Sequence, residues 1–403
     1  MPVLINPSGR FVIVDDPKEF DNLLQTPGFK KPSAQEEEKY LKEREERIGA
    51  MINPPEVMVQ DNRVYLATVS QGGKDGYSIA SGMLIPELKK LGISLQTHFE
   101  NQKVAILFHN PYSIPRIESP YKIIYTMFES DKIPDDWITY LEMADEVIVP
   151  SKWCRDVFAK AGIHAKVVPL GYDSETFVYK ERENKRKAHK PFTFLHYNAF
   201  NIRKGFVEVF KAFVKEFDST EPVRMIFKTT VDPIPLPITR EKYPNIEVIS
   251  GRMNDNDLVD ICHRSDCFVF PSRGEGFGMT PLEAMGTGMP AIVPNAHGIS
   301  EYFDPKYMYE AKVSAMCPAL YSRYKDQDVG KMVVCDVDQL ASQMRWVYEH
   351  QDEALEMGKK ASEYVKQWTF ENTAQQMKVI LEEALSKHVD DNINKNKLSL
   401  ELI

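Results

Sequence analysis

From Arg63 onward, short apolar runs alternate with longer stretches of helical periodicity. This alternation is typical of parallel sheets that carry helices on their faces, so the sequence predicts an α/β fold with two such sheets. The strands predicted in the first half are Val64–Val69, Val104–Phe108, Lys122–Met127, Glu146–Val149 and Lys166–Pro169. Those predicted in the second half are Phe192–His196, Arg224–Lys228, Ile246–Ile249, Cys267–Pro271 and Ala291–Pro294.

The sequence predicts five consecutive parts of the chain. Residues 1–55 form an appended N-terminal arm, with a strand-like run Phe11–Val14 and a charge cluster Glu36–Arg47. The alternating Glu and Lys of that cluster favour a solvated helix, and a partner surface for oligomerisation is the alternative. Two α/β domains follow at 56–178 and 191–367, joined by a charged linker at 179–190. The last part, 368–403, is predicted to be a closing helix over Trp368–Leu385 with a frayed polar tail.

Length and composition fit a folded protein of two or three domains. The chain has 403 residues, of which 43% are hydrophobic and 27% charged, as in globular proteins. A net charge of -9 has the wrong sign for binding nucleic acid over the whole surface, although a local basic groove is compatible with it. The five cysteines lack zinc-site spacing and are predicted to be reduced core residues.

No targeting or membrane segment is evident in the sequence. The chain does not open with the charged and then apolar pattern of a signal peptide, and it contains no apolar run long enough to span a bilayer. We therefore predict a cytoplasmic protein without a transmembrane segment.

A glycine-rich loop follows the predicted strand Cys267–Pro271. Its sequence from Ser272 to Gly278 has three glycines, which allow a close approach to a ligand, and a helix is predicted to start at once. Thr280 is placed as the helix cap, with Pro281 at the first helical position and Glu283 completing a capping box. The backbone N–H groups of Gly278, Met279 and Thr280 would then form an anion site at the helix N-terminus.

Two carboxylates flank this anion site. Glu283 has a purely structural alternative, since a carboxylate at the third helical position can serve only as a cap. Glu275 lies among glycines, where its evident use is to accept hydrogen bonds. Carboxylates on both sides of an anion-binding turn suit a ligand with hydroxyls at both ends and phosphate in the middle, as in a sugar nucleotide.

These residues resemble a known enzyme family. The runs 271–278, 281–285 and 288–290 look like the paired-glutamate motif of retaining family 4 glycosyltransferases, and the resemblance extends over Val57–Leu385. It implies the GT-B fold, with two Rossmann-like parallel-sheet domains facing across a cleft: 56–178 on the acceptor side and 191–367 binding the nucleotide sugar. It also implies that Glu275 contacts the hexose hydroxyls, that Glu283 holds the ribose, and that Phe277, Gly278, Met279 and Thr280 contact the diphosphate. The donor would be a UDP- or GDP-sugar, and no cofactor is implied.

Cations accompany the motif. Arg203 and Lys204 open a helix, where they oppose its dipole, and a bound diphosphate would reverse that penalty. The resemblance gives Lys204 and Lys228, which ends a strand, the role of neutralising the leaving diphosphate. Asn198 stands where some relatives carry an arginine. For Arg203, a donor contact and a solvent-exposed helix cation both remain open.

The first half supplies candidates on the acceptor side. The turn after Val64–Val69 contains Gly73, which the resemblance places near the donor, and Tyr77, a candidate acceptor residue. The glycines of this turn have a structural alternative. His109 follows a strand and is either catalytic or structural. Asn110 and Glu129, also at strand ends, are further acceptor-side candidates.

The sequence offers no residue that must be an enzymic nucleophile. We therefore expect same-face attack assisted by the leaving diphosphate, with no metal, because no Asp-x-Asp motif takes that role. The alternatives are a nucleotide-sugar epimerase, a glycan phosphorylase, or a GT-B-like module that binds a sugar nucleotide or glycan without turnover. The acceptor is open among a glycan, a lipid, a protein and a modified nucleic acid.

Overall fold

The computed structural model describes residues 3–7, 11–13, 17–42, 63–67, 76–230, 238–239, 241–324 and 327–400. The chain divides into two compact units, residues 1–60 and 61–403. In the first unit, β1 (Val3–Ile5) pairs antiparallel with β2 (Phe11–Ile13), and α1 (Pro17–Leu24) follows. Residues 34–42 are helical, as predicted for the start of the charge cluster, whose residues 43–47 lie outside the described part, as does Val14.

The second unit contains two six-stranded sheets. The N-terminal lobe is built on the order β4-β3-β5-β6-β7-β8, all parallel. Its strands are β3 (Arg63–Ala67), β4 (Ser94–Gln96), β5 (Val104–Phe108), β6 (Tyr121–Tyr125), β7 (Glu146–Val149) and β8 (Lys166–Val167). Every residue of β5 is buried, because helices cover both faces of a parallel sheet and central strands become continuous apolar runs.

The C-terminal lobe is built on the order β11-β10-β9-β12-β13-β14, also parallel. Its strands are β9 (Phe192–Tyr197), β10 (Val223–Lys228), β11 (Ile246–Ile249), β12 (Cys267–Val269), β13 (Ala291–Val293) and β14 (Tyr309–Glu310). The strand order reverses between β9 and β12. In doubly wound sheets, such a switch point opens a crevice for ligands at the carboxyl ends of the strands.

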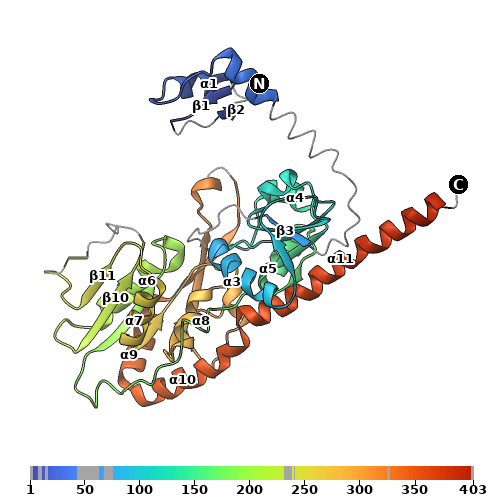
Figure 1. Ribbon diagram of the computed structural model, residues 1–403. Coiled ribbons are helices and arrows are strands. Elements are labelled where there is room, and N and C mark those ends of the chain that lie inside the picture. The colour runs from blue at the N-terminus through green and yellow to red at the C-terminus, as the bar shows by residue number, and fades with distance from the viewer. Residues whose placement is uncertain are drawn as a thin grey trace. The chain divides into compact units, whose positions relative to one another are not determined.

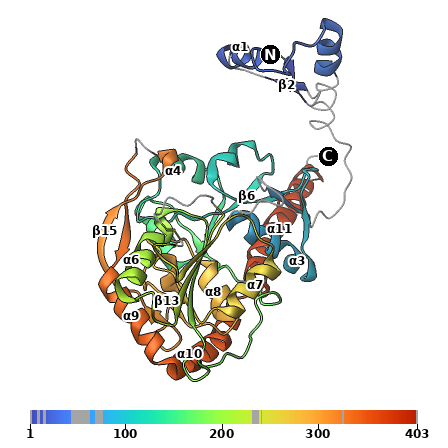
Figure 2. The ribbon, with the colours of Figure 1, turned by 90° about the vertical axis from the view of Figure 1, so that its left-hand side faces the viewer.

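Helices cover both sheets (Figure 1 and Figure 2). In α6, Phe206, Val209, Phe210 and Phe213 are buried at helical spacing, which gives that helix its packed face. Figure 1 shows α11 leaving the C-terminal lobe and running along the N-terminal lobe, where it packs against α3. The helices are α3 (Gly76–Lys90), α4 (Asp135–Leu141), α5 (Lys152–Lys160), α6 (Phe206–Glu216), α7 (Asp255–Arg264), α8 (Met279–Gly286), α9 (Val337–Glu349), α10 (Gln351–Tyr364) and α11 (Phe370–Leu400). Short 3-10 helices are η1 (Pro111–Arg116), η2 (Ile202–Lys204), η3 (His297–Glu301), η4 (Ser322–Tyr324) and η5 (Val365–Gln367).

The two parallel sheets confirm the predicted fold, and all ten predicted strands appear with ends shifted by a few residues or less. Strands β4 and β14 were not predicted. Nor was the antiparallel hairpin of β15 (Val313–Pro318) and β16 (Lys331–Cys335). Its first strand is mostly exposed, so it lacks the alternating pattern that marks a half-buried strand.

Two further predictions need correction or detail. The polar tail expected to fray is helical to Leu400; the segment after Leu385 contains neither Gly nor Pro to stop the helix. The linker at 179–190 has no regular strand or α-helix, yet Arg182 fastens it to the C-terminal lobe by donating to the Cys262 carbonyl at 3.0 Å and the Thr287 hydroxyl at 2.9 Å. In the described part of the chain, no helix is both long and apolar enough to cross a membrane.

Candidate active site

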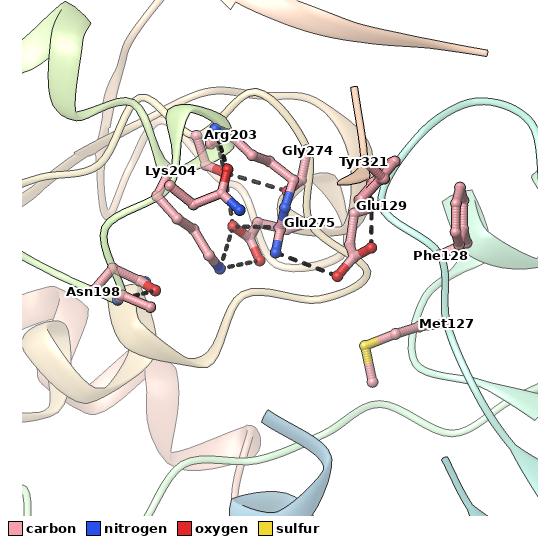
Figure 3. A network of polar contacts seen from close by, with 12 residues as sticks. Met127, Phe128, Glu129, Asn198, Arg203, Lys204, Gly274, Glu275 and Tyr321 are labelled. Carbon is pink, nitrogen blue, oxygen red and sulfur yellow. Dashed lines mark hydrogen bonds and ion pairs between the residues drawn. The ribbon is translucent and has the colours of Figure 1, made fainter. Parts of the chain in front are cut away.

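The loops after β9 and β12 meet at the switch point of the C-terminal lobe. Gly205, at the junction of η2 and α6, has a φ of 80°, and a Cβ there would lie 2.4 Å from the Pro271 carbonyl oxygen. Glycine is therefore required for the two loops to approach. The same contact brings Lys204, on the first loop, to Glu275 on the second (Figure 3).

Glu275 is held by three side chains. Its carboxylate accepts hydrogen bonds from Lys204 Nζ at 2.8 and 3.0 Å and from Ser272 Oγ at 2.7 Å, and it pairs with Arg203 at 3.2 Å. Its side chain is 8% exposed. Burial opposes its ionisation, but Lys204 and Arg203 outweigh burial and lower the pKa of Glu275 to about 2. The group is a buried anion at every working pH.

Lys204 is correspondingly a buried cation with a second cation beside it. Burial and the neighbouring Arg203 both lower the pKa of Lys204, and Glu275 opposes them. Its ammonium also lies 5.7 Å from the Phe270 ring centre, within cation–π range.

Arg203 is not a solvent-exposed cation. Its side chain is 14% exposed, and the guanidinium pairs with Glu275 and, at 3.3 Å, with Glu129 of the N-terminal lobe. It also donates to the Gly274 carbonyl. The structure therefore makes Arg203 a support for the loop that carries Glu275 (Figure 3).

Helix α8 begins earlier than predicted. Its N-cap is Gly278, with a φ of 92°, and Met279 is the first helical residue. Thr280 is consequently not the cap, and the predicted capping box of Thr280 and Glu283 is wrong. The reason is that the left-handed conformation of Gly278 turns the chain into the helix without a capping side chain. The first-turn N–H groups remain an anion-binding element, since they have no intrahelical partner. The Phe277 side chain is core, packed against Tyr302.

Glu283 lies in α8 and makes no capping hydrogen bond at the helix N-terminus. Tyr197, at the end of β9, donates to its carboxylate at 2.9 Å. Burial raises the pKa of Glu283 from 4.5 to about 7. Glu275 and Glu283 therefore differ in their ionisation near neutrality, because cations offset burial at Glu275, whereas at Glu283 the hydrogen bond from Tyr197 offsets it only in part.

Lys228 lies at the neighbouring strand end, where β10 pairs with β9. Its ammonium donates to the carbonyls of Thr229 at 2.9 Å and Gly251 at 2.7 Å, and the residue is 6% exposed. These contacts hold the ammonium at the carboxyl end of β10, beside the end of β9. Asn198 Nδ2 lies 3.4 Å from Thr280 Oγ1 at the start of α8.

In the N-terminal lobe, the candidates differ in how many polar contacts they make. Tyr77 donates to the Met127 carbonyl at 3.1 Å and accepts from the Met127 amide at 3.0 Å. The His109 ring lies 5.1 Å from that of Tyr77, and its Nδ1 is buried without a partner in the described part of the chain. Asn110 precedes η1 without a side-chain cap bond. Gly73 lies outside the described residues.

The carboxyl edges of the two sheets are in contact. Ser151, which follows β7, donates to the Gly276 carbonyl at 2.8 Å, and the Lys152 amide donates to Glu301 at 2.7 Å. A Cβ on Gly276 would lie 2.7 Å from the Met127 side chain. The glycine-rich loop is therefore enclosed by both lobes.

Some residues at the site were not predicted. Ser272 and Tyr197 donate hydrogen bonds to Glu275 and Glu283. Ser272 lies within the glycine-rich run that the sequence singled out, and Tyr197 directly follows a predicted strand. His297 contacts the Ser272 carbonyl at 3.0 Å, and burial lowers the pKa of His297 to about 4. Tyr321, which lies between β15 and β16, donates a hydrogen bond to Glu129 at 3.2 Å. No pattern in the sequence singles out Tyr321. Among the described residues, no group of His, Cys, Asp and Glu side chains is arranged to hold a metal ion.

The segment that carries this site is similar to a known protein family. Residues 178–314, which carry Lys204, Glu275 and Glu283, match the family model for glycosyl transferases group 1. Over 49 residues the chain is 51% identical to mannosylfructose-phosphate synthase of Agrobacterium fabrum, a match that covers 12% of this chain and 11% of that protein. Matches to two filamentous-virus proteins, at 25% and 24% identity, reach 53% and 58% of the length of those relatives.

Solved structures give the same fold. Sucrose-phosphate synthase from Thermosynechococcus elongatus superposes with a TM-score of 0.60 at 13% identity, over 81% of this chain and 99% of that one. Anabaena HepE, solved with UDP-glucose, gives a TM-score of 0.58 at 13% identity over 81% of this chain and 99% of that one. The fold is that of the GT-B glycosyltransferases, and the matched segment supports a glycosyltransferase of group 1.

Proposed function

We propose that this chain is a retaining hexosyltransferase that uses a nucleoside-diphosphate sugar. One observation carries the proposal: a buried glutamate, Glu275, is kept ionised by Lys204 and Arg203 next to the N-terminus of α8, at the switch point of a doubly wound sheet. The family match covers these residues. The site therefore combines an anion-binding helix end with a fixed hydrogen-bond acceptor, which are the two elements that a sugar nucleotide requires.

The donor would lie along α8 as follows. Its diphosphate accepts hydrogen bonds from the first-turn N–H groups of α8, and Lys204 offsets its charge. The hexose hydroxyls donate to Glu275, which has no acidic proton to give. The ribose hydroxyls donate to Glu283, beside Tyr197. The phosphate oxygens are thus matched by N–H donors, and the hydroxyls at both ends of the donor are matched by carboxylate acceptors.

Transfer then needs no enzymic nucleophile. The bond between the anomeric carbon and the diphosphate oxygen breaks, and the acceptor oxygen forms its bond on the same face. The acceptor proton passes to the departing diphosphate oxygen. Lys204 and the α8 dipole stabilise the charge that develops on the leaving group, which is the role that a divalent metal has in other sugar transferases. We propose that activity is independent of metal ions.

The assay is incubation of the purified chain with a panel of UDP- and GDP-hexoses. We expect release of nucleoside diphosphate from one donor, unchanged by a metal chelator and independent of added phosphate. Tight binding of a sugar nucleotide by calorimetry with no release would instead indicate a binding module. Release that requires inorganic phosphate would indicate a phosphorylase. The acceptor, whether glycan, lipid, protein or modified nucleic acid, would follow from a mass-spectrometric screen with the active donor.

A further inference from the structure

The β15–β16 hairpin belongs to the C-terminal lobe, yet the segment between its strands packs on the N-terminal lobe (Figure 2). Tyr324 accepts a hydrogen bond from Trp137 Nε1 of α4 at 3.1 Å and another from Tyr112 at 3.3 Å. The Tyr321 ring lies 5.1 Å from that of Phe128. These aromatic contacts pack the hairpin side chains against η1, α4 and the segment after β6 that carries Glu129.

Two hydrogen bonds between Asp131 and Lys331 hold the hairpin to the N-terminal lobe. The Lys331 amide donates to the Asp131 carboxylate at 2.6 Å, and the Asp131 amide donates to the Lys331 carbonyl at 3.1 Å. Gly330 has a φ of 79°, and a Cβ there would lie 2.2 Å from Asp131 Oδ1. A side chain at 330 would therefore separate the hairpin from the segment that follows β6.

Glu129 occupies the point where this junction reaches the candidate active site (Figure 3). One carboxylate oxygen accepts from the Tyr321 hydroxyl at 3.2 Å, and the other pairs with Arg203 at 3.3 Å. The Glu129 main chain lies against Gly274, where a Cβ would be 2.0 Å from its carbonyl oxygen. A residue of the N-terminal lobe is thus held by three residues of the C-terminal lobe.

The contact between Glu129 and Arg203 also affects the balance of charge around Glu275. Lys204 and Arg203 are two cations, and both approach the same oxygen of Glu275, at 2.8 and 3.2 Å. Glu129 supplies the second carboxylate. Burial disfavours the Arg203 charge, but Glu129, followed by Glu275, keeps its pKa above the ordinary value. Without Glu129, the guanidinium would have only Glu275 as an anionic partner among the pairs seen here, and would compete with a sugar for that carboxylate.

We propose that Glu129 is a positioning residue for transfer: it shares Arg203 with Glu275, which limits the competition of the guanidinium with the donor hexose for the Glu275 carboxylate, and Tyr321 orients Glu129. The inference rests on the proposed function. It also means that the donor carboxylate is set correctly only when the N-terminal lobe and the hairpin are in contact. Glu129, expected from the sequence to face the acceptor, instead acts through Arg203.

The test compares Glu129→Gln and Tyr321→Phe with Tyr112→Phe. The last is a matched control, because it removes a tyrosine hydroxyl from the same junction without a contact to Glu129 or Arg203 in the described part of the chain. With the donor found in the panel, we expect Glu129→Gln to lower kcat by about tenfold or more, Tyr321→Phe by about threefold, and Tyr112→Phe by less than about twofold, on the scale of one hydrogen bond to a charged group. The KM for the donor should change less than kcat in each case.

A double-mutant cycle identifies the route of the effect. If Glu129 acts through Arg203, Glu129→Gln should have little further effect on kcat in an Arg203→Gln background. Full additivity, or wild-type kcat in Glu129→Gln, would overturn the inference while leaving the transferase assignment intact.

A readout without turnover separates this inference from failure of the proposed function. Silence of the wild type with every sugar nucleotide would refute the proposed function alone. Amide hydrogen exchange over η2 should still be faster in Glu129→Gln than in the wild type, because Arg203 loses its partner in the other lobe, and should be unchanged in Tyr112→Phe. Unchanged exchange over η2 in Glu129→Gln would refute the positioning role.

Discussion

The carboxyl edges of the two sheets carry different kinds of site. On the C-terminal edge, Glu275, Lys204 and Arg203 are nearly buried and bonded to one another. On the N-terminal edge, His109 is only partly buried and its Nδ1 has no partner among the described residues, and Asn110 makes no cap bond. A pre-organised cluster suits a ligand whose charged parts are constant, such as a nucleoside diphosphate, whereas a ring nitrogen such as His109 Nδ1, unpartnered among the described residues, suits a partner that supplies a hydrogen bond.

The largest effect is expected from the C-terminal edge. Glu275→Ala should lower kcat by about 10²- to 10³-fold, the scale of losing one pre-organised polar contact to the transition state. The measurement is donor-dependent release of nucleoside diphosphate. Glu208→Gln is the matched control, since Glu208 is also a buried partner of an arginine, Arg273, at 2.6 Å but lies outside the cluster; it should lose stability and keep kcat. Equal losses of kcat in Glu275→Ala and Glu208→Gln would show that the effect is not specific to Glu275.

The contact between the loops after β9 and β12 can be disrupted by a substitution that changes no charged residue. Gly205→Ala adds a Cβ 2.4 Å from the Pro271 carbonyl in a left-handed conformation, so we expect a loss of about 2 kcal/mol or more in the free energy of unfolding. Urea denaturation measures it. Gly82→Ala is the control: Gly82 lies within α3, where an added Cβ would meet open space, and this change should stabilise by about 0.5–1 kcal/mol. Destabilisation by both would show that the close approach is not the cause.

The two glutamates are expected to differ in their response to pH. Glu275, with a pKa of about 2, does not titrate in the working range, whereas Glu283 ionises around pH 7. Because its native pKa is raised, Glu283 stabilises the fold at pH below 4.5, and this contribution is lost as the pH rises through about 7. Ionised Glu283 is the better acceptor for ribose hydroxyls, so the donor KM should fall by up to about tenfold between about pH 6 and pH 8. A Glu283→Gln variant should show a flat profile, and a persisting slope there would assign the effect to another group.

The smallest effect is expected on the N-terminal edge. His109→Phe keeps a ring beside Tyr77 and removes the buried ring nitrogen. We expect the KM for the acceptor to rise by about two- to tenfold, the scale of one neutral hydrogen bond, with the KM for the donor unchanged. Steady-state kinetics with the identified acceptor measures both. A loss of kcat as large as that of Glu275→Ala would mean that the two edges share the chemistry equally.

Features that depend on neighbouring residues in the sequence could be predicted, whereas contacts between the two lobes could not. The strands and helices follow from local patterns, because β-strand burial and helix amphipathicity are periodic in sequence. Arg203 and Lys204, expected to open a helix, instead lie in η2, before α6. The contact of Lys204 with Glu275 joins two separate loops and has no local signal. The start of α8 was misplaced because a glycine in the left-handed conformation replaced the expected threonine cap. The roles of Glu129 and Tyr321 could not be predicted, since each depends on a residue of the other lobe, and the exposed hairpin strand has no amphipathic period.

The central claim is retaining transfer from a nucleotide sugar bound at Glu275 and Lys204. Proton NMR of the anomeric signal most directly tests it, in a reaction of the wild type with the active α-linked donor and, where no acceptor is known, water. The account predicts that the first product to accumulate carries the α configuration and that Glu275→Ala forms none at a comparable rate. A β product that appears first would contradict it.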